Sequence, residues 1–232
     1  MKALLPFKLT SIGLIALILF ASCSRHNYGD SYFWQQAMHH RVIAIVPAEM
    51  VFVGTIPKNV TPEAISDIEE RESIAFEQSL YNGVLRFAHT RDYMLSVYVQ
   101  DISTTKKLLA DNHISIRDSW KQDDKELARI LGVDAIVRMR IQKKRYMSDL
   151  ASYGVGVGRA VLSQIGSNNG FFVPYIPNKT NDISASCNVV SNNITLWNDY
   201  YKGSSDWNRP SEQIIDDITY LFGRHFPYRR RI

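Results

Sequence analysis

The stretch Gly132–Ile141, GVDAIVRMRI, gives the clearest indication of the fold. Its odd-numbered positions are all apolar, and most of its even-numbered positions are charged. Because successive side chains of a strand point to opposite faces, one face of this strand should be packed and the other should meet water. The residues before it, Glu126–Leu131, predict the end of a helix, which Gly132 closes with a left-handed backbone. The stretch therefore predicts a helix followed by a half-buried strand.

Two strong patterns lie upstream of this stretch. Val42–Val46 is apolar on both faces and closed by Pro47, as expected of a central strand. Thr61 and Pro62 then predict a helix start. The apolar positions that recur at helical spacing after it are Ile65, Ile68, Phe76, Leu80, Val84 and Phe87. A second strand over Met94–Gln100 and a short helix over Ser103–Asn112 follow.

Downstream, alternation around Cys187, the turn residues Ser191–Asn193 and the run Ile194–Trp197 predict an antiparallel hairpin. The last element, from about Pro210 to His225, has an apolar stripe at helical spacing and is stopped by a proline. The order strand, helix, strand, helix, helix, strand, hairpin, helix predicts an α/β fold: a mixed sheet with helices packed on it.

Four segments carry a resemblance to a known group of envelope proteins. They are RVIAIVPAEM (41–50), ELARILGVDAIVRMRI (126–141), NNITLWNDYY (192–201) and the final Phe226-Pro227-Tyr228. They resemble the group that holds the curli-secretion channel lipoprotein CsgG, the TolB N-terminal domain and the peptidoglycan-synthase activator lipoproteins. The resemblance implies a CsgG/TolB-N-like periplasmic domain that binds other proteins and is not an enzyme. It gives Asp134, at the entry to a strand, no chemical role.

The N-terminus has the layout of a cleaved signal peptide. Lys2 and Lys8 are its only charges, and the uncharged stretch Leu9–Ser22 is too short for a transmembrane helix. Cys23, directly after small residues, resembles the lipobox cysteine of bacterial lipoproteins, which implies diacylglycerol on its thiol and palmitate among its acyl groups. We expect a signal peptide over 1–22, a tether over 23–40, and a periplasmic domain over 41–228 with an insertion at 146–181.

Charge and cysteine content narrow the class of protein. The formal net charge of +4 is concentrated in the signal peptide and at Arg229–Arg231, within an expected basic tail over 229–232. That tail is solvated or lies near anionic head groups; nucleic-acid binding is not expected. With Cys23 acylated, Cys187 has no cysteine partner, so the core must hold the fold. Ser24 after Cys23 favours the outer membrane, with the domain facing the periplasm.

No residue pattern predicts a catalytic, metal or cofactor site. His39–His40 has no further ligand at metal-binding spacing. Asp123–Asp124 falls at a helix start, and Asp216–Asp217 on the wet side of the last helix, so both are expected to cap or be solvated. Gly154–Gly158 lacks the spacing of a dinucleotide loop. Cys187 shares the face of apolar neighbours, which predicts a buried, inert thiol. We expect no small-molecule substrate.

The insertion separates the two functions that remain open. Its first half can form a helix or a strand, but the alternation breaks at Arg159, and Pro174 and Pro177 are poor in a spanning strand. We therefore favour a partner-binding loop over a pore hairpin. The expected function is a lipid-anchored, non-catalytic protein that binds or supports another envelope component, through an envelope protein partner or self-association. The rival is a subunit of an oligomeric outer-membrane secretion channel like the curli pore. Possible partner-binding residues are Tyr153, Phe171, Phe172, Tyr175 and Trp207.

Overall fold

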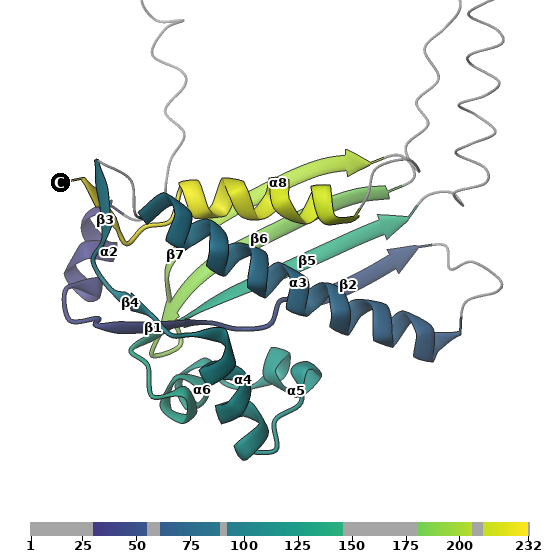
Figure 1. Ribbon diagram of the computed structural model, residues 1–232, viewed down its shortest axis with the longest axis horizontal. Coiled ribbons are helices and arrows are strands. Elements are labelled where there is room, and N and C mark those ends of the chain that lie inside the picture. The colour runs from purple at the N-terminus through teal and green to yellow at the C-terminus, as the bar shows by residue number, and fades with distance from the viewer. Residues whose placement is uncertain (1–29, 55–60, 89–91, 146–180, 206–210, 232) are drawn as a thin grey trace, which may run out of the picture.

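The structure, a computed structural model, describes residues 30–54, 61–88, 92–145, 181–205 and 211–231. A mixed sheet carries helices on both faces, and a two-stranded ribbon lies at one end of the molecule (Figure 1). The predicted α/β class, with helices packed on a mixed sheet, is confirmed.

The sheet has the order β4-β1-β5-β6-β7, and β2 also pairs with β5. Its strands are β1 (Val42–Ile45), β2 (Glu49–Gly54), β4 (Tyr98–Val99), β5 (Ala135–Arg145), β6 (Asn181–Ser191) and β7 (Ile194–Ser205). β1 and β2 run parallel to β5 along the same edge, one after the other, and Pro47 falls in the break between them. The β5–β6 and β6–β7 pairs are antiparallel. The predicted hairpin is confirmed: its turn residues Asn192 and Asn193 have φ angles of 50° and 63°, which suit a two-residue turn.

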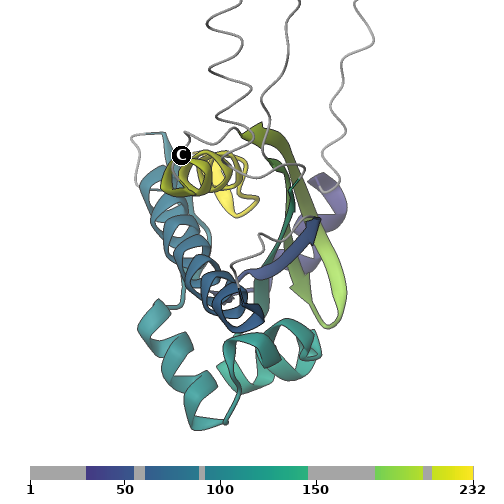
Figure 2. The same cartoon turned by 90° about the vertical axis from the view of Figure 1, so that its right-hand side faces the viewer.

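Two long helices cover one face of the sheet. In Figure 2, α3 (Pro62–Ala88) and α8 (Ser211–Arg224) lie side by side across this face. The amide of Ala64 donates to the Oγ1 of Thr61 (3.2 Å), so the predicted helix start is confirmed. The inward-facing residues of β5 and β6 pack against α3 and α8 in the main core, which includes Phe76, Leu80, Val84, Val137, Met139, Ala185, Cys187, Ile218 and Phe222.

A smaller helical cluster covers one end of the opposite face. It consists of α4 (Ile102–Asp111), α5 (Ile116–Lys121) and α6 (Asp124–Leu131). Leu109, Leu127 and Leu131 pack there against Ala44 and Ile136 of the sheet. Gly132 ends α6 with a φ of 66°, as predicted. No helix among the described residues is both long and apolar enough to cross a membrane.

The expected strand over Met94–Gln100 is divided in the structure. Its first part, β3 (Tyr93–Leu95), leaves the main sheet and pairs with β8 (Arg229–Arg231), while its second part is β4. The arginines expected as a basic tail therefore form a strand. Cation–π contacts hold them: the guanidinium of Arg229 lies 4.4 Å from the ring centre of Tyr93, and that of Arg230 lies 4.5 Å from Trp34.

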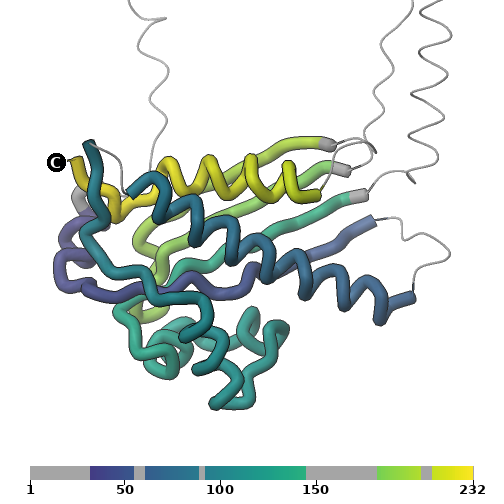
Figure 3. The backbone as a smooth tube through the Cα atoms, in the orientation of Figure 1, coloured from purple at the N-terminus to yellow at the C-terminus, as the bar shows by residue number. Residues whose placement is uncertain are grey.

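The described structure includes residues before the expected domain start at Arg41. Asp30–Ala37, within the expected tether, forms helix α2, and Phe33 packs into the main core with only 2% of its surface exposed. Its ring meets that of Tyr228 edge-on, with centroids 5.0 Å apart. Figure 3 shows α2 and the C-terminal strand at the same end of the molecule. The two ends of the described chain therefore meet.

Candidate functional site

None of the residues predicted to form a site lies within the described parts of the chain. Cys23, the predicted lipidation residue, precedes the described parts, and residues 146–180 of the expected insertion and residues 206–210 fall between them. The undescribed candidates are Cys23, Tyr153, Phe171, Phe172, Tyr175 and Trp207. The strands that flank the insertion are described: Arg145 pairs with Asn181, so the chain leaves and rejoins the sheet at adjacent positions.

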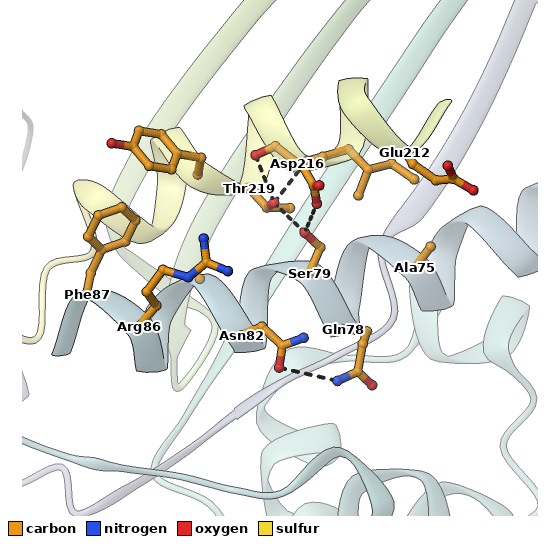
Figure 4. A pocket seen from close by; sticks show the side chains of 12 residues that line it. Ala75, Gln78, Ser79, Asn82, Arg86, Phe87, Glu212, Asp216 and Thr219 are labelled. Atoms are coloured by element: carbon orange, nitrogen blue, oxygen red, sulfur yellow. Dashed lines mark hydrogen bonds between the residues drawn. The ribbon is translucent and has the colours of Figure 1, made fainter. Parts of the chain in front are cut away.

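The structure offers a different candidate site, a groove between α3 and α8. Its volume is about 370 Å³, and both helices contribute polar side chains to it (Figure 4). The lining residues are Ala75, Gln78, Ser79, Asn82, Gly83, Arg86, Phe87, Glu212, Ile215, Asp216, Thr219 and Tyr220. We call it the α3–α8 groove.

A hydrogen-bonded cluster forms the middle of the α3–α8 groove. The hydroxyl of Ser79 donates to the Oδ1 of Asp216 (2.9 Å) and lies 2.7 Å from the hydroxyl of Thr219. The Thr219 hydroxyl in turn donates to the carbonyl of Ile215 (2.9 Å). Figure 4 shows the three side chains pointing toward one another from the facing helices. These contacts tie α3 to α8 and satisfy the polar groups at the groove floor.

The two ends of the α3–α8 groove differ in character. At one end, the rings of Phe87 and Tyr220 meet edge-on with centroids 5.0 Å apart, and the exposed Arg86 stands beside them (Figure 4). At the other end lies the exposed carboxylate of Glu212. The groove thus offers an aromatic and cationic end, a hydroxyl-rich middle and an anionic end, which together suit a peptide segment of a protein partner.

The groove lining lacks the residue types of the common acyl-transfer sites. Its described residues include no histidine, lysine or cysteine, and the group that accepts the Ser79 hydroxyl is the carboxylate of Asp216. The Asp216 carboxylate holds the Ser79 hydroxyl on the exposed helix surface. The geometry favours binding over acyl transfer.

Helix α3 carries one acid whose side chain is fully buried. Glu77 has no exposed surface, and neither of its carboxylate oxygens has a hydrogen-bond partner among the described residues. Burial raises its pKa to about 8, and the charge of Lys106 opposes this rise. Glu77 lines a hollow of about 430 Å³, whose other lining residues are mainly apolar and come mostly from α3, α4 and the segment between α4 and α5. At neutral pH Glu77 is therefore mostly a neutral acid inside the fold.

The histidines and acids noted in the sequence have structural roles. Asp123 caps α6 by accepting the amide of Glu126 (3.0 Å), as expected of an acid at a helix start. The Nδ1 of His40 lies 2.6 Å from the buried hydroxyl of Tyr228. Asp134 accepts the amides of Arg41 (2.7 Å) and Val42 (2.9 Å). Burial pushes the Asp134 pKa up, but these amides outweigh it and hold the pKa below its ordinary value.

The described residues contain no candidate metal site, and their one cysteine is buried. No group of three or more His, Cys, Asp or Glu side chains is placed to hold a metal ion in that part of the chain. Cys187 is fully buried in the main core, and burial raises the pKa of its thiol, so the predicted inert thiol is confirmed.

The α3–α8 groove was not predicted from the sequence. Its residues come from helices about 140 positions apart, and each helix alone shows only polar residues on a wet side. One signal was available: Gly83 and Gly223 interrupt otherwise regular helical patterns, and such glycines often mark close packing of two backbones. Only the tertiary structure shows which backbones meet.

Comparison with known proteins gives a weak structural likeness. The chain matches no family model, and no characterised protein shows significant sequence similarity to it. Among solved structures, it is similar to lipoprotein GNA1162 from Neisseria meningitidis at 13% identity and a TM-score of 0.36, over 79% of this chain and 94% of that chain. It is also similar to the PelC dodecamer from Paraburkholderia phytofirmans at 7% identity and a TM-score of 0.35, over 80% and 85% of the two chains.

A third likeness is to the C-terminal domain of LpoB from Escherichia coli, at 9% identity and a TM-score of 0.30, over 83% of this chain and 94% of that domain. These similar structures include bacterial lipoproteins. At these scores, neither a function nor a partner is transferred to this chain.

Proposed function

We propose that this chain is an outer-membrane lipoprotein, acylated at Cys23, whose periplasmic domain binds another envelope protein and catalyses no reaction. The observation that carries the proposal is the N-terminal pattern: two lysines, an uncharged stretch to Ser22, and a cysteine directly after small residues. Several acyl chains give durable anchoring, because one chain alone binds a membrane only marginally.

The α3–α8 groove supports binding as the task of the domain. It combines an aromatic pair, hydroxyl and amide groups, and charges of both signs on a surface held by helix packing. Protein interfaces are enriched in aromatic residues and arginine, and Tyr220 and Arg86 supply both here. Tyr153, Phe171, Phe172, Tyr175 and Trp207 remain proposed contacts for the same partner.

We also propose that the domain belongs with the CsgG, TolB N-terminal and peptidoglycan-synthase activator group. The segments that carry this resemblance occupy central places in the fold. Pro47 follows β1, and Asp134 anchors the start of β1 at the entry to β5. Trp197 of β7 meets Phe226 after α8, with ring centroids 6.3 Å apart.

Acylation tests the anchor directly. Cells that express the full chain are fed a labelled fatty acid. The Cys23→Ala variant should carry no label. It should also either leave the membrane fraction or keep its signal peptide uncleaved. Cys187→Ala is the matched control, because it removes the buried thiol and should leave labelling unchanged. Label on the Cys23→Ala variant would exclude this lipoprotein assignment.

Binding through the groove is tested by photo-crosslinking in living cells. A photoreactive amino acid at Asn82, which lines the groove, should give one defined adduct that mass spectrometry assigns to an envelope protein. Gln213 on α8 is exposed but does not line the groove, so the same probe there should not give that adduct. Equal adducts from both positions would argue against the groove. An adduct of the chain with itself would favour self-association.

A further inference from the structure

One end of the molecule combines arginines with exposed aromatic and methionine side chains. It is formed by α2, β3 and β8, which lie together in Figure 1, and we call it the α2–β3–β8 end. Met38 is 64% exposed, Met94 is 52% exposed and Tyr32 is 49% exposed. These large apolar side chains lie on β3 and on or just after α2, beside the arginine run of β8, which is an uncommon combination for a surface that meets only water.

The arginines of this end are held in place. The strand register sets Arg230 opposite Met94 and Arg231 opposite Tyr93. The guanidinium of Arg230 stacks on Trp34, and that of Arg229 stacks on Tyr93 and, at 5.4 Å, on Phe87. The side chains of Arg230 and Arg231 are exposed. Stacking uses the face of a guanidinium and leaves its edge N–H groups available, and these groups match phosphate oxygens.

The chain length places this end close to the proposed anchor. Asp30, the first residue of α2, follows Cys23 by seven residues. A chain of that length spans at most roughly 25 Å when fully extended. The start of α2 therefore cannot move farther than this from the acyl chains of an anchored molecule. The opposite end of the long axis, where α3 begins, lies much farther along the fold (Figure 1).

We propose that the α2–β3–β8 end rests on anionic phospholipid head groups beside the acylated cysteine. This inference depends on the proposed acylation of Cys23. The guanidinium groups of Arg230 and Arg231 bind lipid phosphates, while Tyr32, Met38 and Met94 enter the interfacial layer, where amphipathic rings and apolar side chains are favoured. Asp30 at the start of α2 and Asp92 next to β3 carry the opposite charge, and the three arginines of β8 outnumber them. The contact orients the domain, so that the start of α3 points away from the membrane.

The test uses the full acylated lipoprotein in lipid vesicles. A fluorophore is attached at Met94→Cys, or at Ile68→Cys in the first part of α3 as the matched position; the buried Cys187 stays unlabelled. Vesicles contain a head-group quencher lipid in phosphatidylcholine, with or without phosphatidylglycerol. With phosphatidylglycerol we expect at least threefold stronger quenching at Met94→Cys than at Ile68→Cys. Quenching should fall to the neutral-vesicle level in high salt.

The double variant Arg230→Gln with Arg231→Gln should also reduce quenching at Met94→Cys to the neutral-vesicle level. It keeps Arg229 on its aromatic partners, and an unchanged thermal melt shows that β8 remains folded. Equal quenching at both labels, or quenching indifferent to lipid charge, overturns the contact. The lipid contact is also overturned if the label at Met94→Cys is shielded from a water-soluble quencher but is not quenched by the lipid. That result would mean that this end contacts protein. Loss of the protein from floated vesicles instead refutes the acyl anchor.

Discussion

The backbones of Gly223 in α8 and Gly83 in α3 meet directly. A Cβ atom added to Gly223 would lie 3.0 Å from the carbonyl carbon of Gly83, whereas one added to Gly83 would lie 3.4 Å from the carbonyl oxygen of Thr219. The first distance is tighter than nearly all real Cβ contacts, and because the neighbour is backbone, a methyl group at Gly223 would require the two helices to shift apart by a few tenths of an ångström. The second is close to an ordinary contact.

We therefore expect opposite results from two alanine substitutions. Gly223→Ala should force α8 away from α3 and lower the free energy of unfolding by about 1–3 kcal/mol. Gly83→Ala should be neutral or stabilising by up to about 1 kcal/mol, because alanine is the better helix former. Urea denaturation of both variants measures the difference. Equal stability of the two would contradict the close crossing.

Glu77 should give the fold a characteristic pH dependence. Its pKa is about 8 in the folded protein, against an ordinary value of 4.5. Between these values the folded state holds a proton that the unfolded state has released. The stability that Glu77 contributes is thus complete below pH 4.5 and is lost as the pH rises to 8, at up to ~1.4 kcal/mol per pH unit.

Denaturation of Glu77→Gln at pH 5 and pH 8 checks this assignment. The variant cannot ionise, so the fall in unfolding free energy between the two pH values should be smaller than in the wild type. Glu63→Gln, at the exposed start of the same helix, is the control and should keep the wild-type slope. An unchanged slope in Glu77→Gln would show that the acid is not buried in a neutral state.

Phe222 and Leu221 of the last helix are buried to different degrees. The ring of Phe222 is fully buried in the main core, whereas Leu221 is half-buried. Phe222→Ala should cost about 3–5 kcal/mol of stability, and Leu221→Ala about 1–2 kcal/mol. Thermal or chemical denaturation compares them. A larger loss for Leu221→Ala would mean that α8 is rotated about its axis.

Removal of the insertion separates the two open functions. Because Arg145 pairs with Asn181, the strands already meet where the insertion starts. Deletion of Gly154–Pro177 with a short Gly-Ser linker should leave a folded domain with a melting temperature near that of the intact chain. We expect that variant to lose its partner in co-purification from detergent-solubilised membranes. Ring-shaped oligomers or ion conductance of the intact protein in bilayers, abolished by the deletion, would instead establish a channel.

Elements with a local signal could be predicted from the sequence. Gly132 directly follows a helical pattern, where a glycine readily adopts the left-handed backbone that ends a helix, and Asn192–Asn193 suits a hairpin turn. The α5 helix was missed because its six residues carry too little periodicity, although Ser115 and Asp118 form a capping box.

Elements that depend on distant contacts could not be predicted. Arg229–Arg231 carries three charges, so a solvated tail was the natural interpretation; its strand exists because β3 and three aromatic rings receive it. Phe33 likewise packs against Tyr228, which lies near the other end of the chain, and the local sequence gives no sign of this contact. The α3–α8 groove has the same origin, since it requires Ser79 and Asp216 to meet across 137 residues.

The pairing of β1 and β2 with β5 also sets an order of events during synthesis. Ile43 pairs with Ala135 and Met50 with Ile141, about 90 residues later. Until β5 has been made, β2 lacks its partner and β1 can pair only with the two-residue β4. Non-local pairing of this kind is slow to form. A newly made chain therefore lacks its central sheet until β5, which lies beyond the midpoint of the sequence, has been synthesised.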